Sequence, residues 1–312
     1  MYYYKIYGLY VKSDYKLEEA IEVPIEAIRK IDVEIFSEEL EVQLTTEAEI
    51  DNEIEGGIVY HYEVHRGWVR SKGQGCFVMR SGKQISYQLK EGYNPLVVSQ
   101  VILCAALPAI LVQRGILAIH GSGILWGEKA IIVSGVSGSG KSTLTSRLLE
   151  NGGVFMGDDT VAIEEKNGKI FAHPTYPQQK LCLDVVDETT KFKGKLILLP
   201  SDGGVEKYAL RLKEGFCIEE KELEAIVILN TSEVKEVTIK EIQGSEKIKY
   251  LLNNLFRYRT YVELGMPAET FKKCIEVANN VKIYVLTRPK EGMTVEEQVE
   301  KLKKELGSRE KE

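Results

Sequence analysis

The sequence predicts an α/β domain that follows a smaller, mainly β domain. From residue 1 to about 93, short runs alternate between apolar and polar residues, which is typical of half-buried strands joined by hairpins. From Ile116 onward, apolar strands alternate with helical segments. The chain has 312 residues, of which 44% are hydrophobic, so two domains fit its length. We expect the β domain at 1–93, the α/β domain at 94–306 and a solvated tail at 307–312.

The N-terminal domain is predicted from alternating runs that turn signals separate. These runs are "YYYKIYGLYV", "LEVQLT", "IVYHYEV" and "CFVMRSGKQISYQL". The last contains Ser81-Gly82-Lys83, a sequence that suits the turn of a hairpin. No chemical motif accompanies these strands, so the candidate role of this domain is recognition of a substrate or a partner.

One apolar segment tests the alternative of a membrane protein. The run "VILCAALPAILV", Val101–Val112, has 12 residues and contains Pro108, whereas a membrane span needs about 20 residues. The N-terminus also lacks the basic start and apolar core of a secretory signal. The sequence therefore predicts a buried helix here and a soluble, cytoplasmic protein.

Charge and cysteine spacing exclude several further classes. The net charge is −6 and charges of both signs are mixed along the chain, which gives no general attraction to nucleic acid or anionic membranes. The five cysteines never approach CxxC spacing, and there are only four histidines. We predict reduced thiols, no structural zinc, and neither a nucleic-acid nor a membrane partner. A homo-oligomer remains an open alternative.

The stretch "GVSGSGKS", Gly135–Ser142, fits the P-loop pattern G-x-x-x-x-G-K-[ST]. A buried strand, "AIIV", precedes it and a helix, "TLTSRLLENG", follows it, as the motif requires. Its glycines let backbone N–H groups point at phosphate oxygens. Lys141 brings charge to the terminal phosphates, and the Ser142 hydroxyl suits Mg²⁺. The predicted nucleotide-binding residues are Gly135, Ser137, Gly138, Ser139, Gly140, Lys141, Ser142 and Thr143.

Two adjacent carboxylates, Asp158 and Asp159, follow the next apolar run, "VFMG". They should lie at the carboxyl end of a strand, where α/β sheets usually bind ligands. Neighbouring like charges repel unless a cation lies between them or one is protonated, and both arrangements suit catalysis. A solvated turn, "GDDT", is the alternative interpretation.

The segment Leu107–Ile163 resembles the C-terminal domain of the HPr kinase/phosphorylase family. The shared features are a His-Gly at the end of one strand, a P-loop 15 residues later, and a Gly-Asp-Asp on the strand after the P-loop helix. His120 precedes Lys141 by 21 residues and Asp158 follows it by 17, spacings that agree with the family. The lead-in "LPAILVQRGILAIHGSGI" is also similar to that of smaller HPr kinase-like enzymes found beside peptide-modification genes.

The resemblance implies an α/β P-loop kinase domain with the HPr kinase/phosphoenolpyruvate carboxykinase-like fold. Such an enzyme moves the γ-phosphoryl of a nucleoside triphosphate such as ATP onto a serine-type hydroxyl, with Mg²⁺. By the family's pattern, Lys141 and the P-loop hold the phosphates, and Ser142 and Asp158 serve the metal. The same pattern makes Asp159 the base and places His120 near the transferred phosphoryl.

The sequence departs from the family after the aspartates. The family carries a glycine-rich signature of acidic residues and arginine, whereas His173–Val185 reads "HPTYPQQKLCLDV". Lys180 could supply the positive charge there, although an ordinary surface lysine is an equal interpretation. HPr itself is therefore a doubtful substrate. Transition-state charge calls for a further cation, and the candidates are Arg211, Arg257, Arg259 and Arg288.

Three functions remain after other P-loop classes are compared. The chain lacks the "LSGGQ" of ABC-type ATPases and the N-K-x-D of GTPases. The leading prediction is an ATP-dependent kinase that acts on a seryl hydroxyl in a peptide or protein. The alternatives are a kinase for a small hydroxylated metabolite such as free serine, and a nucleotide-gated binding protein with slow hydrolysis. The aspartate pair favours a kinase, since a switch needs only one acid for Mg²⁺.

Overall fold

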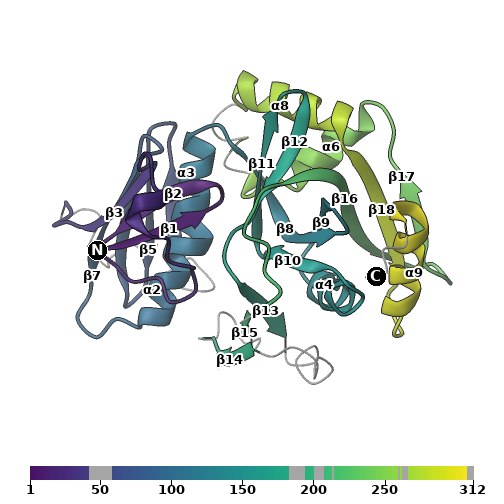
Figure 1. Ribbon diagram of the computed structural model, residues 1–312, viewed down its shortest axis with the longest axis horizontal. Coiled ribbons are helices and arrows are strands. Elements are labelled where there is room, and N and C mark those ends of the chain that lie inside the picture. Colours follow the sequence, from purple (N-terminus) through teal and green to yellow (C-terminus); the bar gives the residue numbers. More distant parts are fainter. Residues whose placement is uncertain are drawn as a thin grey trace.

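The described chain forms two large β-sheets, a small sheet and the helices that cover them (Figure 1). This computed structural model describes residues 1–41, 58–182, 194–199, 207–212, 214–258, 261 and 266–307. Most of the predicted strand "LEVQLT" and most of the predicted tail lie outside these ranges. The mixed α/β architecture agrees with the class predicted from the sequence.

The first sheet joins seven described strands in the order β1-β2-β3-β7-β6-β5-β4. The hairpins turn on pairs of residues with positive φ, namely Tyr7-Gly8 between β1 and β2 and Ser81-Gly82 between β6 and β7. The predicted turn at Ser81 is thereby confirmed. The elements are β1 (Tyr2–Ile6), β2 (Leu9–Ser13), the 3₁₀ turn η1 (Ile25–Ala27), β3 (Val33–Ser37), β4 (Ile58–Tyr62), β5 (Arg66–Ser71), β6 (Gly75–Arg80) and β7 (Gln84–Leu89).

A single helical segment covers this sheet and confirms the predicted buried helix. It runs through α2 (Pro95–Val101), the π-helical η2 (Ile102–Ala106) and α3 (Leu107–Gln113), and its apolar side chains join the core beneath the first sheet. The π-helical turn ends two residues before Pro108, a residue that cannot donate a backbone hydrogen bond.

This helix is longer than the apolar run in the sequence suggested. It has 19 residues, and among the described helices it is the one long and apolar enough to cross a membrane. The stretch from Pro95 to Gln100 supplies the extra length. Because 67% of its most apolar window is buried inside the protein, its packing is that of a core helix.

The second sheet joins eight described strands in the order β10-β8-β11-β12-β16-β18-β17, with β9 between β8 and β16. Strand β16 runs parallel to β9 and β18, and the other pairs are antiparallel. The strands are β8 (Leu117–Trp126), β9 (Lys129–Gly135), β10 (Val154–Gly157), β11 (Thr160–Lys166), β12 (Lys169–His173), β16 (Lys221–Ser232), β17 (Thr238–Glu241) and β18 (Lys282–Pro289).

Helices cover both faces of this sheet because its central strands are apolar on both sides. In β9, Ile131 and Val133 join a core with α4 (Lys141–Glu150) and α9 (Val295–Leu306). Ile132 points to the opposite face, into a core with α6 (Glu246–Asn253) and α8 (Ala268–Asn280). The period-two alternation of a strand thus supplies two cores.

The small sheet consists of β13 (Gln178–Cys182), β15 (Lys207–Leu212) and β14 (Gly194–Leu198), in that order. Strand β13 packs against α4 through Gln179, whose amide donates to Ser146 Oγ over 3.2 Å. This contact fixes the small sheet beside the start of α4.

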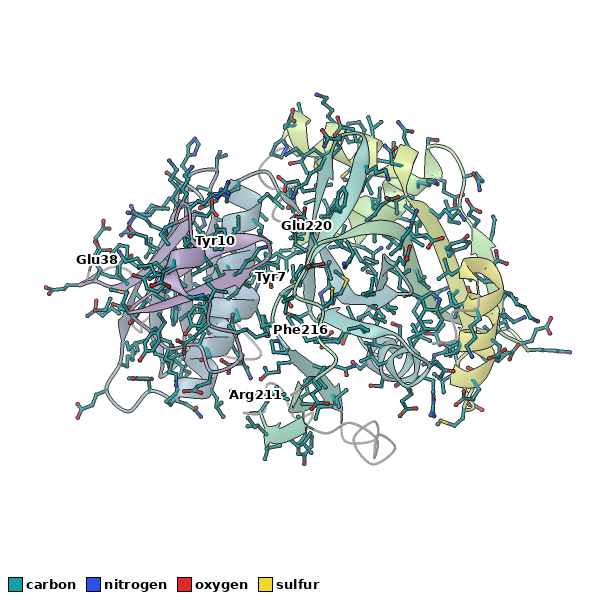
Figure 2. The ribbon with its side chains drawn as sticks, in the orientation of Figure 1. Tyr7, Tyr10, Glu38, Arg211, Phe216 and Glu220 are labelled. Carbon is teal, nitrogen blue, oxygen red and sulfur yellow. The ribbon has the colours of Figure 1, made fainter. Side chains whose placement is uncertain are left out.

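The N-terminal region makes buried, specific contacts with the end of β12 in the second sheet and with β15 in the small sheet. Tyr7 N donates to Pro174 O over 3.0 Å, and Tyr7 lies on the side of the first sheet that faces Glu220 (Figure 2). Arg211 pairs at 2.8 Å with Glu19, whose side chain is 2% exposed. The helix that follows residue 94 packs on the first sheet, and the division into domains at that residue stays a prediction.

We expect Gly8→Ala to destabilise the protein far more than Gly73→Ala. Both glycines have positive φ, 79° and 71°, so alanine costs each about 1 kcal/mol of backbone strain. At Gly8 an added Cβ would also lie 2.4 Å from Nδ1 of His173, a ring held between Glu164 and Glu220. The total loss at Gly8 should be about 3 kcal/mol in urea unfolding. Equal losses for the two variants would contradict this packing.

Candidate functional site

A cleft of about 240 Å³ opens above the loop that joins β9 to α4. It contains all the predicted catalytic and metal-binding residues and most of the predicted nucleotide-binding ones. Among its lining residues are His120, Ser137, Gly138, Gly140, Lys141, Ser142, Thr143, Asp158 and Asp159. Lys180 and Lys207 also line it. Gly135 and Ser139 lie behind this surface.

The loop has the strand–loop–helix context that the sequence predicted. Gly135 ends β9 with φ 137°, and a Cβ there would lie 2.4 Å from Leu229 O on β16, so the close approach requires glycine. Ser139 is 1% exposed and its Oγ has no hydrogen-bond partner among the described residues. Its carbonyl accepts a 3.0 Å hydrogen bond from Arg288 Nε, which anchors the loop.

Lys141, the first residue of α4, is folded toward its own loop. Its Nζ donates to Gly135 O over 2.8 Å and to Val136 O over 2.9 Å. Burial is the largest influence and lowers the pKa of Lys141 below its usual value, while Asp158 and Asp159 act in the opposite direction. The ammonium is therefore held at the loop by two of its carbonyl oxygens.

Asp158 directly follows β10 and is held by two donors. Its Oδ1 accepts a 2.6 Å hydrogen bond from Ser122 Oγ on β8, and its Oδ2 accepts a 2.8 Å bond from the backbone N–H of Lys180 on β13. These bonds fix the carboxylate between two sheets. Asp158 is therefore held by the fold and is not part of a freely solvated turn.

Asp159 is held differently, through its backbone conformation and a cation. Its φ is 70°, a left-handed conformation, and its carbonyl accepts from Gly121 N over 3.2 Å. Its Oδ2 lies 3.6 Å from Lys180 Nζ. Burial is the largest influence and raises the pKa of Asp159, but Lys180 and His120 outweigh it, so the pKa lies below its usual value. Asp159 is consequently ionised at neutral pH.

Lys180 contacts both aspartates, whereas the sequence raised it only as one possible source of positive charge in its segment. Its backbone binds Asp158 and its ammonium faces Asp159. Although burial is the largest influence and lowers the pKa of Lys180, Asp159 raises it well above its usual range. Its Nζ also lies 3.2 Å from Cys104 Sγ. Lys180 is therefore charged in the cleft, and the interpretation as a plain surface lysine is wrong.

The neighbouring Cys104 comes from the helix that covers the first sheet. Its Sγ lies 3.2 Å from Tyr176 Oη, and burial raises the pKa of the Cys104 thiol. The thiol is thus protonated at neutral pH and serves as a neutral neighbour for Lys180. The helix that covers the first sheet in this way contacts a residue that lines the cleft.

His120 lies on β8 and lines the cleft. Its backbone is fixed on both sides, since His120 N donates to Asn254 O over 2.8 Å and His120 O accepts from Ser134 Oγ over 2.6 Å. Ser134 Oγ also lies 2.8 Å from Asn254 Oδ1. This network positions the imidazole near Asp159.

Four arginines were candidates for the additional cation. The three that the structure describes do not line the cleft. Arg211 pairs with Glu19, Arg257 stacks on the Tyr60 ring at 3.8 Å, and Arg288 holds Ser139 O. The last candidate, Arg259, lies outside the described residues. Among the described residues, the cleft takes its cations beyond the P-loop from the lysines of the small sheet. No sequence motif marked Lys207, which joins the site through the pairing of β13 with β15.

Comparisons with known proteins add little to this geometry. No family model matches the chain, and no curated protein matches it. Among solved structures, the Hpr(Ser) kinase/phosphatase from Coxiella burnetii has 8% sequence identity and a TM-score of 0.31, over 61% of this chain and 96% of that one. Similarity at this level assigns no activity to the chain.

We expect Lys180→Met to raise the pKa of Asp159, because the main opposing charge is removed while burial remains. A pH titration of labelled aspartate carboxyls by NMR measures the shift. Lys207→Met is the matched control, since Lys207 lines the same cleft but is not among the largest influences on the Asp159 pKa. An unchanged pKa in Lys180→Met, or the same shift in both variants, would contradict the assignment.

Proposed function

We propose that the cleft is the active site of an ATP-dependent kinase that transfers the γ-phosphoryl to a serine-type hydroxyl of a peptide or protein. One observation carries the proposal: a P-loop lysine, a pair of differently held aspartates and a histidine line a single cleft. A nucleotide switch needs one acid for its metal, whereas phosphoryl transfer to a hydroxyl uses a second as a base.

The P-loop would hold the triphosphate. Ser137, Gly138 and Gly140 present backbone at the cleft, and the amino end of α4 contributes its dipole. Gly140 has φ 101°, a conformation that favours glycine, at the N-cap of this helix. Lys141 would exchange its loop carbonyls for phosphate oxygens, acceptors that carry more negative charge.

The residues present fit a magnesium ion that binds together with the nucleotide. Ser142 and Asp158 line the cleft, and each Asp158 oxygen has one protein donor, which leaves a lone pair on each. The described residues contain no group of three or more His, Cys, Asp or Glu that could hold a metal. The ion would thus need phosphate oxygens and water to complete its shell. When bound, it would neutralise charge on the phosphates.

Asp159 would act as the base of the reaction. The acceptor oxygen forms a bond to the γ-phosphorus, the bond from that phosphorus to the β–γ bridging oxygen breaks, and the hydroxyl proton passes to the Asp159 carboxylate. Lys180 keeps that carboxylate ionised before the reaction. Lys180 and His120 would also stabilise the charge on the transferred group.

Lys141→Ala should weaken ATP binding at least about tenfold, because a charge-assisted contact to phosphate is lost. Calorimetry with ATP and Mg²⁺ measures the affinity, and circular dichroism verifies the fold. Lys290→Ala is the control, since Lys290 forms an exposed ion pair with Glu233. Unchanged ATP affinity in a folded Lys141→Ala protein would rule out the P-loop assignment.

Asp159→Asn should reduce phosphoryl transfer at least ~10²-fold while ATP affinity stays close to that of the native protein, because the base is removed but the phosphate cradle is not. Asp158→Asn is the contrasting variant and should also weaken binding of the Mg²⁺ complex. The assay uses γ-labelled ATP with peptides, proteins and free serine as acceptors, read by mass spectrometry. Slow ATP hydrolysis without any labelled hydroxyl would favour a nucleotide-gated binding protein instead.

A further inference from the structure

The small sheet presents two lysines on one face toward the P-loop cleft. Lys180 on β13 lies opposite Ala209 on β15, and Lys207 is two residues from Ala209 on the same strand. Paired residues, and residues two apart on one strand, share a face of a sheet. Both lysines line the cleft, together with Lys141 at the start of α4. Three ammonium groups, from two separate elements of the fold, therefore line one space of about 240 Å³.

The three lysines differ in how their charge is balanced. Lys180 faces Asp159, with 3.6 Å between Nζ and Oδ2. Lys141 donates to two carbonyl oxygens of its own loop. Lys207, in contrast, is exposed, and within the described part of the chain its ammonium has neither an ion pair nor a hydrogen bond. The described residues thus leave the charge of one lysine in the cleft unbalanced.

Lys207 also repels the lysine of the P-loop. Burial is the largest influence that lowers the pKa of Lys141, and the positive charge of Lys207 lowers it further. An anion that contacts both ammonium groups would relieve this repulsion. The phosphate chain of a nucleotide is an anion of this kind, and Lys141 occupies the position that binds it in the P-loop pattern. A carboxylate of the acceptor would have no reason to lie beside Lys141.

We propose that Lys207 is a further phosphate-binding residue, which contacts the phosphate chain of the nucleotide from the small sheet while Lys141 contacts it from α4. The inference rests on the proposed function only in that a nucleotide occupies the cleft. The small sheet then supplies the additional cation for which the sequence offered arginines, since none of the described candidate arginines lines the cleft.

The test is calorimetric titration of the full chain with ATP and Mg²⁺. Lys207→Met should weaken ATP binding about fivefold or more, because a charge-assisted contact to phosphate is lost. Lys207→Arg keeps the positive charge and should restore most of the native affinity. The difference between Lys207→Met and the native protein should shrink as the salt concentration rises, because salt screens a contact made by an exposed charge.

Lys249→Met is the matched control. It removes the same charge from an exposed position on α6 that does not line the cleft, so ATP affinity should stay at the native value. The melting temperature of ligand-free Lys207→Met should be unchanged or higher, because a repulsive charge is removed. A lower melting temperature would instead indicate that Lys207 serves the fold.

The outcomes separate this inference from the proposed function. If the native protein binds ATP and Lys141→Ala weakens that binding, native affinity in folded Lys207→Met refutes the role of Lys207 alone. A higher KM for the acceptor at unchanged ATP affinity would assign Lys207 to the acceptor and likewise overturn the inference. Absence of ATP binding by the native protein would refute the proposed function and this inference together.

Discussion

Two adjacent carboxylates at the end of one strand repel each other, and the site depends on how the protein resolves that repulsion. Lys180 meets both of them, one with its backbone N–H and one with its ammonium. As a result Asp158 is fixed by neutral donors while Asp159 faces a cation. Two identical groups in different surroundings can take different chemical roles, which is how one site can supply both a metal ligand and a base.

The position of Lys180 in turn depends on packing from three directions. Gln179 binds Ser146 on α4, Arg211 of the adjacent strand binds Glu19 of the N-terminal region, and Cys104 meets the ammonium from the helix beneath the first sheet. A strand held in this way loses little conformational freedom when a ligand arrives. Catalytic groups that are fixed beforehand require little reorganisation during the reaction.

The sequence predicted what depends on local patterns and missed what depends on distant contacts. The P-loop, its flanking strand and helix, and the aspartates after β10 follow from short motifs whose backbone geometry is set within about twenty residues. Lys180 sits in "HPTYPQQKLCLDV", a stretch without periodic pattern, and only the pairing of β13 and its contact with Asp158 bring it to the cleft. Lys207 was beyond local pattern for the same reason, and so was the packing of the predicted buried helix on the first sheet.

The contact between Cys104 and Lys180 links the evolution of the two halves of the chain. It belongs to a helix whose apolar side chains fill the core of the first sheet, yet it forms part of the wall around Lys180. Recombination that joined the half with the P-loop motif to a different N-terminal half would give this ammonium a different neighbour. We therefore expect the two halves to be inherited together. Substitutions of Cys104 and of Lys180 should occur together as well.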